Sequence, residues 1–91
     1  MKFLEFKYYS EDLEVDEITK KDKLVEIKIV NRRAISSLYK TTNEKGIEFG
    51  VLVVWNYFGD GWASGQDYYV NISEFNNIRK KLLEVLWRII I

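Results

Sequence analysis

The most hydrophobic stretch of the chain reads IEFGVLVVWNY, residues 47–57. Its apolar run from Val51 to Trp55 lacks strict alternation, which is typical of a strand whose two faces are both covered. We therefore expect this stretch to form the central strand of a sheet. Gly50 lies inside it, where a missing side chain indicates either a bulge or a crowded neighbour.

Shorter strand patterns flank this stretch along the chain. Residues 2–9 and 24–30 alternate apolar with polar side chains at the period of half-buried strands, and residues 35–42 repeat that pattern weakly. The apolar face of the second pattern carries Val25, Ile27 and Ile29. Residues 10–23 fit neither period, so a loop, a short hairpin arm and a frayed helix stay open for them.

Turn signals connect the central strand to its neighbours. Residues 43–46, Asn-Glu-Lys-Gly, supply turn chemistry before it, and residues 58–66 hold three glycines and an aspartate after it. Residues 67–71 return to strand composition. The pattern therefore predicts a hairpin on each side of the central strand.

A C-terminal helix is predicted from about Glu74 to Ile89, with Ser73 as its N-cap. Apolar side chains recur along it at steps of three and four, so one stripe faces the sheet. That stripe consists of Phe75, Ile78, Leu82, Leu86 and Ile89. We expect one α+β domain over residues 1–91, in which the helix packs on an antiparallel sheet of four to five strands, open or curled into a small barrel.

The composition restricts the chemistry that the chain can perform. Cysteine and histidine are absent, which excludes disulfides, histidine-activated nucleophiles, and thiolate or imidazole zinc sites. We expect no metal and no cofactor. Carboxylates remain, and Asp60 and Asp67 flank the glycine-rich loop closely enough to suggest a small carboxylate-dependent enzyme. Aspartates also serve turns, so we favour this function least.

Aromatic side chains gather around the loop at residues 58–66. Rings beside glycines can form a platform that holds a sugar, a nucleobase or an apolar side chain of another protein. The competing interpretation is that alternate rings complete the core of a small domain. Trp62, between glycines in mid-loop, is the ring that this second interpretation explains least. We predict a partner-binding surface made by Trp55, Tyr57, Phe58, Trp62 and Tyr68.

The last turn of the predicted helix is apolar almost all round. At about 100° per residue, Trp87 and Ile91 point away from the stripe that faces the sheet, so both would face water in a single copy. Apolar exposure of this kind marks interfaces, although a chain end can also extend as a strand or fold back into the core. We predict a homodimer whose contact is made by Leu83, Trp87, Ile90 and Ile91.

These features predict a non-catalytic binding or regulatory module with an unidentified protein partner, such as a phage- or mobile-element-encoded regulator or inhibitor. The alternative is a single-stranded nucleic-acid-binding protein, which a net charge of zero does not favour. Its contacts would come from Arg32, Arg33, Arg79 and Lys80. Because the chain carries neither a signal-peptide core nor a long apolar run, we expect no membrane contact and a cytoplasmic location, in the host cell if the protein is viral.

Overall fold

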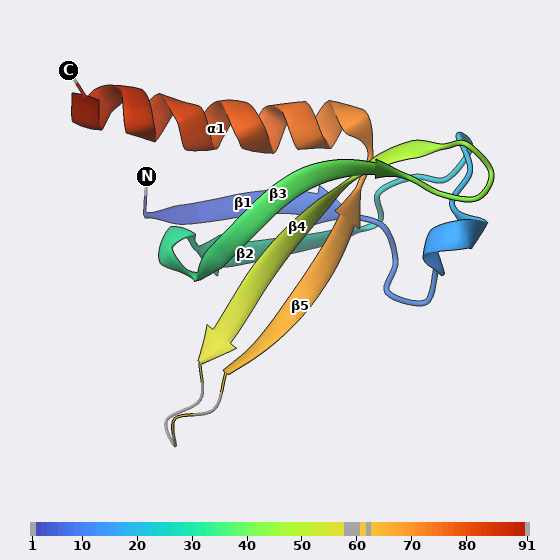
Figure 1. Cartoon of the computed structure of the whole chain (residues 1–91), viewed down its shortest axis with the longest axis horizontal. Coiled ribbons are helices and arrows are strands. Elements are labelled where there is room, and N and C mark those ends of the chain that lie inside the picture. Colours follow the sequence, from blue (N-terminus) through green and yellow to red (C-terminus); the bar gives the residue numbers. More distant parts are fainter. Residues whose placement is uncertain (1, 58–60, 62, 91) are drawn as a thin grey trace.

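The computed structural model describes residues 2–57, 61 and 63–90, with the side chains of all of these except 57 and 84–90. Figure 1 shows the elements. In chain order they are β1 (Phe3–Tyr8), η1 (Val15–Glu17), β2 (Glu26–Asn31), η2 (Arg32–Ala34), β3 (Ile35–Thr42), β4 (Glu48–Tyr57), β5 (Ala63–Val70) and α1 (Ile72–Ile90).

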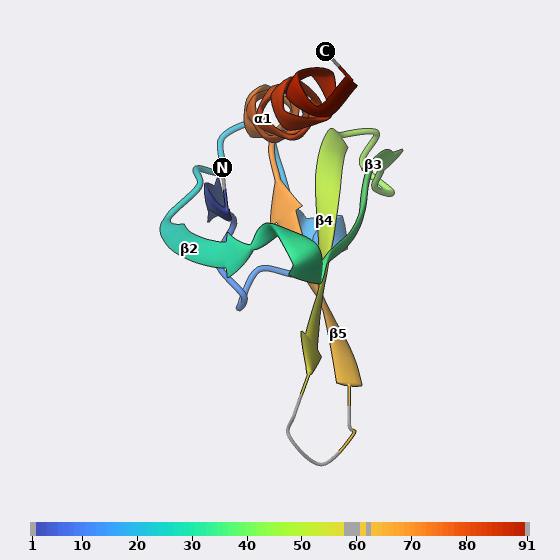
Figure 2. The same ribbon diagram turned by 90° about the vertical axis from the view of Figure 1, so that its left-hand side faces the viewer.

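The strands form two antiparallel sheets, so the prediction of a single sheet of four to five strands is wrong. β1 pairs with β2, and β4 lies between β3 and β5. The break falls at the short helix η2, where the side chain of Asn31 accepts a hydrogen bond from the amide of Arg33 (2.9 Å). This corner leads the chain from one sheet to the other (Figure 2).

The two sheets meet at one end without closing. The amide of Tyr9, just after β1, donates a hydrogen bond to the carbonyl of Tyr69 in β5 (2.8 Å). Beyond that point β1 does not pair with β5, and the described strands form no closed barrel. The α+β class, the antiparallel pairing and the single C-terminal helix are as predicted.

β4 is the central strand of its sheet and is covered on both faces from Phe49 to Val54, as most of its uninterrupted apolar run predicts. Leu52 and Val54 point toward β1, β2 and the helix, into a core that includes Phe6. Phe49 and Val51 point to the opposite face, where a second core forms. We call this opposite side the back face of the sheet β3–β4–β5.

Residues 10–23 are the loop that builds the second core. The loop contains one turn of 3-10 helix and places Ile18, which is completely buried, against Phe49 and Val51. Of the three alternatives left open for this stretch, the loop is the one observed. It is ordered by apolar burial and by Asn43, not by a regular secondary structure of its own.

Asn43 connects this loop to the turn between β3 and β4. It is only 8% exposed, and its amide nitrogen donates to the carbonyls of Val15 (3.0 Å) and Ile18 (2.9 Å). Its side-chain oxygen accepts from the amides of Lys45 and Ile47, each at 3.0 Å. One side chain therefore both forms the predicted turn and fixes the loop to it.

The helix begins two residues earlier than predicted and has a different N-cap. Asn71, not Ser73, supplies the capping oxygen, which accepts from the amide of Glu74 at 2.8 Å. The helix packs against β4 where Gly50 leaves room for it: a Cβ at that position would lie 2.9 Å from the Cβ of Phe75. The crowded neighbour that Gly50 indicates is thus the first turn of the helix. Phe75 and Ile78 are buried as the predicted stripe requires.

Candidate interaction surfaces

Trp55 is the one predicted partner-binding ring whose side chain the structure places on the surface. It lies on the back face of the sheet and is 40% exposed. Its ring atoms lie over Gly65 on β5, where an added Cβ would be 3.7 Å from them. Tyr57 ends β4, and its side chain lies outside the described part, as do Phe58 and Trp62. The loop platform therefore stays a prediction apart from Trp55.

Tyr68 belongs to the core, so its assignment to an exposed binding surface is wrong. It is 1% exposed and packs edge-on against Tyr8 and Phe6, with ring centroids 4.9 and 5.3 Å away. The reason is strand alternation: Tyr68 lies opposite Leu52 and shares its face, which the two-stranded sheet covers. This is the core interpretation that the sequence had left open for the aromatic residues.

Tyr39 is an exposed ring that the sequence interpretation missed. It lies on β3 opposite Val51, on the same face as Trp55, and is 46% exposed. Between the two rings lies Val53, which is half-buried. The loop 10–23 covers Phe49 and Val51, Val53 packs at the margin of this second core, and Tyr39 and Trp55 stay exposed beside it. We call Tyr39, Val53 and Trp55 the aromatic face.

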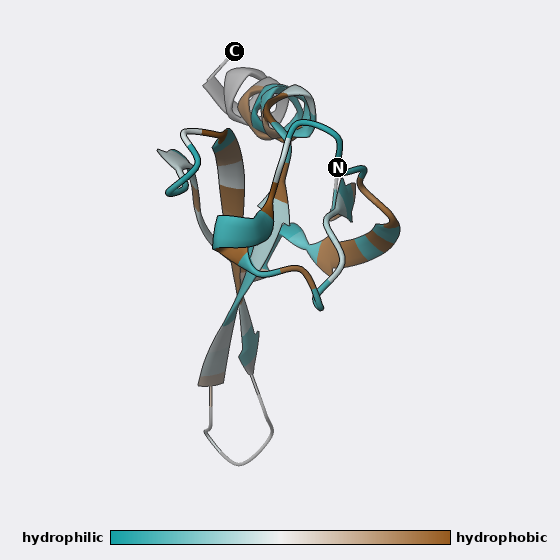
Figure 3. Cartoon of the chain, turned by 90° about the vertical axis from the view of Figure 1, so that its right-hand side faces the viewer, coloured by the Kyte–Doolittle hydropathy of each residue, from teal (hydrophilic) through white to brown (hydrophobic). Residues whose placement is uncertain are grey.

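A second uncovered surface lies on β2. The predicted apolar face of this strand, Val25, Ile27 and Ile29, points outward and is 66%, 60% and 62% exposed. The inward positions carry Glu26, Lys28 and Val30, of which only Val30 is buried. Leu4, Phe6 and Tyr8 of β1 fill the core instead. Figure 3 shows the resulting alternation along β2 at the rim of the molecule.

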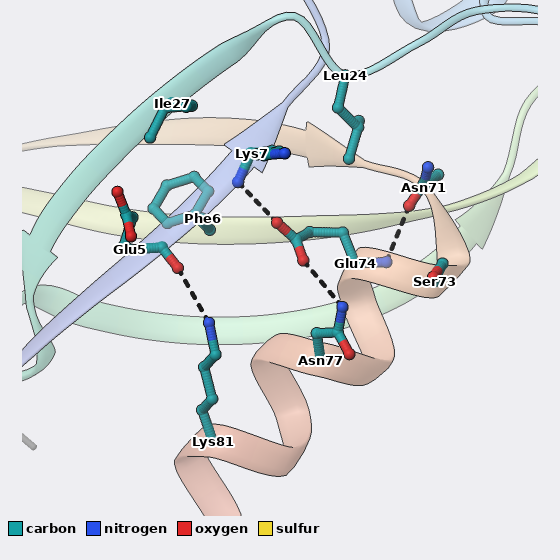
Figure 4. A pocket seen from close by; sticks show the side chains of 10 residues that line it. All are labelled: Glu5, Phe6, Lys7, Leu24, Ile27, Asn71, Ser73, Glu74, Asn77 and Lys81. Carbon is teal, nitrogen blue, oxygen red and sulfur yellow. Dashed lines mark hydrogen bonds between the residues drawn. The ribbon is translucent and has the colours of Figure 1, made fainter.

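The helix covers the edge of β1 that does not pair with β2 (Figure 4). The carboxylate of Glu74 accepts a hydrogen bond from the backbone amide of Lys7 (2.7 Å) and another from the side chain of Asn77 (3.3 Å). The ammonium of Lys81 donates to the backbone carbonyl of Glu5 (3.4 Å). These side chains line a cleft of about 400 Å³. Because these side chains satisfy backbone groups at the β1 edge, we attribute the cleft to the packing of the helix against β1 and do not treat it as a binding site.

The basic residues of the nucleic-acid alternative come from two elements. Arg32 and Arg33 form the η2 corner, and Arg79 and Lys80 are exposed on the helix. A groove of about 580 Å³ between β2 and β4 lies beside the corner. Its polar lining includes the ammonium of Lys28, which lies 5.6 Å from the centroid of the Tyr68 ring.

The clear pKa shifts among the described residues belong to tyrosines. Burial, a hydrogen bond to Glu26 and the negative charge of Glu11 raise the pKa of Tyr8 to about 12. Burial also raises the pKa of Tyr9 and Tyr69. All three hydroxyls therefore stay protonated and neutral at physiological pH, which suits packing and hydrogen bonding.

The aspartate pair of the carboxylate alternative is described at one position. Asp67 is exposed on β5, whereas Asp60 lies outside the described part. Residues 2–57, 61 and 63–90 contain no group of three or more possible metal ligands. In the same residues, no helix has the length and apolar content to cross a membrane.

The predicted dimer contact is described at one position. Leu83 is 49% exposed on the outer side of the helix. The side chains of Trp87, Ile90 and Ile91 lie outside the described part, so the helix-mediated dimer stays a prediction. Comparison with protein-family models, with curated proteins and with solved structures finds no match to this chain.

Proposed function

We propose that this chain is a binding module that recognises a protein partner through the aromatic face and regulates that partner by binding it. The observation that carries the proposal is the 40% exposure of Trp55 on an uncovered part of the sheet. A tryptophan buries a large apolar area when a partner covers it and loses little conformational entropy, because it has two rotatable side-chain bonds. Tryptophan and tyrosine are accordingly enriched at the residues that dominate binding energy.

The surroundings of Trp55 support this role. Gly65 opposite it adds no side chain, so the indole lies over bare backbone there, and 40% of the residue stays exposed. Tyr39 supplies a second exposed ring on the same face, and Val53 lies between the positions of the two rings in the sheet. A regular sheet holds all three side chains, which favours recognition by a preformed surface.

Photo-crosslinking tests the proposal directly. A photoreactive amino acid at position 55, and separately at position 39, should capture the same protein from a lysate of the source cells. Placed at the buried position of Tyr68, the same group should capture none. A partner caught equally well from a distant surface, such as the exposed Asn76 on the helix, would contradict recognition by the aromatic face.

Affinity gives the quantitative arm of this test. Trp55→Ala should weaken binding of the captured protein about thirtyfold or more, the effect of losing a dominant interface residue of about 2 kcal/mol. The melting temperature should change little, because the side chain is nearly half exposed. Unchanged affinity in a folded variant would refute the proposal.

Single-stranded nucleic acid is the second candidate ligand, because the groove between β2 and β4 is lined by Lys28 and lies beside the basic corner at η2. Lys28, Asn31, Trp55 and Asn56 line it, close to the arginines of η2. Phosphate contacts make such binding strongly salt-dependent. Titration with a fluorescent oligonucleotide at two salt concentrations decides the matter: no binding at low salt removes this candidate.

A further inference from the structure

β2 has one edge that no described strand covers. The strand pairs with β1 alone, and Figure 2 shows it at the rim of the molecule with open space on its outer side. Such an edge presents unpaired backbone donors and acceptors to any extended segment that fits it. The other open edge of this small sheet, on β1, is already covered by side chains of the helix.

The backbone groups at that edge can be identified from β1. The amides of Lys7 and Tyr9 and the carbonyl of Glu5 all bond away from β2. In an antiparallel pair, successive residues direct these groups to alternate edges. The even-numbered residues of β1 therefore bond with β2, and Phe6 lies opposite Lys28. It follows that Ile27 and Ile29 direct their N–H and C=O groups to the uncovered edge. The amide of Val25, just before β2, instead donates to the carbonyl of Tyr8 (3.1 Å), so the backbone hydrogen bonds offered at this edge come from Ile27 and Ile29.

We propose that a second copy of this chain pairs antiparallel with that edge, with Ile27 opposite Ile27 of the second copy. In this register Glu26 lies opposite Lys28 of the second copy, and Val25 lies opposite Ile29 of the second copy. Each charge then meets its opposite, and each apolar residue meets another. A continuous four-stranded sheet, β1–β2 with its symmetric counterpart, results.

Neighbouring symmetric registers fit worse. Each symmetric register has a two-fold axis at the residue that lies opposite its own copy. An axis at Lys28 places two ammonium groups opposite each other, which is unfavourable. An axis at Ile29 places Ile27 opposite Asn31, and so loses the apolar contact. A net charge of zero leaves no long-range repulsion between two copies. Sequence, charge and hydrogen-bonding alternation therefore select the axis at Ile27.

The absence of cysteine from the chain makes this register testable by disulfide formation. Directly opposed residues in a hydrogen-bonded pair have Cα atoms about 5.5 Å apart, which suits a disulfide. Ile27→Cys should therefore form a covalent dimer under mild oxidation. In Ile29→Cys, the matched control of equal exposure, the two thiols would lie about 13 Å apart along the strands.

Pairing raises the effective thiol concentration from micromolar to roughly millimolar, so Ile27→Cys should crosslink at least about tenfold faster than Ile29→Cys. Equal rates would overturn the proposal, because they indicate random collision. Crosslinking that is faster in Ile29→Cys would overturn it as well, since it requires another register.

Reversing the charges of the pair provides a second test of the β2 contact. Glu26→Lys should weaken the dimer about tenfold or more, because two opposite-charge pairs become like-charge pairs. Adding Lys28→Glu should restore the dimer in sedimentation equilibrium. Since Glu26 also bonds to Tyr8, a melting curve must show that each variant is folded. Failure of the double variant to restore association, with both variants folded, refutes the pairing.

The helix provides the control for the location of the contact. Changing both Trp87 and Ile91 to serine should leave the β2 dimer intact. A monomer in that variant, together with unchanged association in Glu26→Lys, would assign the dimer to the helix and overturn the pairing. Trp55→Ala should also leave the dimer intact, so the β2 contact and the proposed partner surface can fail independently.

Discussion

Replacing Gly50 with alanine tests how closely the helix is packed against β4. The new Cβ would lie 2.9 Å from both Cβ and Cδ2 of Phe75 and 3.0 Å from Cγ2 of Val70. Ordinary contacts begin at 3.4 Å, so the strand and the helix must separate by about half an ångström. A different rotamer of Phe75 would move Cδ2 but not Cβ, which the helix backbone holds in place. The clash therefore requires movement of the helix itself.

Overpacking of this kind costs about 1–3 kcal/mol. In a domain of this size each kcal/mol lowers the melting temperature by roughly 4–8 °C, so Gly50→Ala should melt about 4–24 °C below the unchanged protein. Circular dichroism during heating measures the shift, and urea unfolding measures the free energy of unfolding.

Gly65→Ala is the matched control, since Gly65 lies in the neighbouring strand of the same hairpin. Its added Cβ would meet the ring of Trp55 at 3.7–3.8 Å, an ordinary contact. We expect its stability to change by no more than about 0.5 kcal/mol. If both alanine variants melt together, or Gly50→Ala melts like the unchanged protein, the close helix packing described above is refuted.

Three further predictions concern the loop, the tyrosine cluster and the β1 edge. Asn43→Ala removes four hydrogen bonds and should lower the free energy of unfolding, measured in urea, by about 2–4 kcal/mol. Asn31→Ala, which removes a single exposed hydrogen bond, is the control. A smaller loss in Asn43→Ala than in this control would contradict the role of Asn43. Because the pKa of Tyr8 is raised from 10 to about 12, its contribution to stability is complete below pH 10 and is lost as pH rises from 10 to 12. Tyr8→Phe should therefore flatten the fall in stability over this range, and an equally steep fall would contradict the assignment. Glu74→Ala should cost about 1–2 kcal/mol and speed hydrogen exchange at the amide of Lys7, which loses its acceptor; unchanged exchange there would show that the carboxylate does not protect the edge.

The elements of this fold can largely be predicted from the sequence, because each has its own local signal. The apolar run in residues 47–57 is continuous because two cores cover β4. Residues 35–42 form a strand with the predicted bounds, and the turn at 43–46 has the left-handed Gly46 that its composition indicates. The N-cap was misassigned because Asn71 and Ser73 are both good capping residues and lie only two positions apart.

The arrangement of the elements could not be predicted in the same way. Alternation in residues 24–30 identifies an apolar face but not the direction it points, and here β1 supplies the core while Val25, Ile27 and Ile29 face outward. Nor does the sequence indicate that Glu74 and Lys81, on a helix far along the chain, bond to the backbone of β1 at the edge that does not pair with β2.

The predicted partner-binding rings fall on different faces of the sheet for the same reason. Trp55 and Tyr68 are both aromatic residues near the glycine-rich loop, yet their strand positions place Trp55 on the back face and Tyr68 in the core. Tyr39 was missed because its strand pattern is weak and it is distant in sequence from the glycine-rich loop. Only the pairing of β3 with β4 brings it to the face of Trp55.

Hydrogen exchange of the chain, alone and bound to its captured partner, tests most directly whether the aromatic face is the site of recognition. We predict slower exchange on binding in peptides that contain Tyr39, Val53 and Trp55, with little change in the first turns of the helix. Protection confined to the helix, with exchange around Trp55 unchanged, would contradict this account.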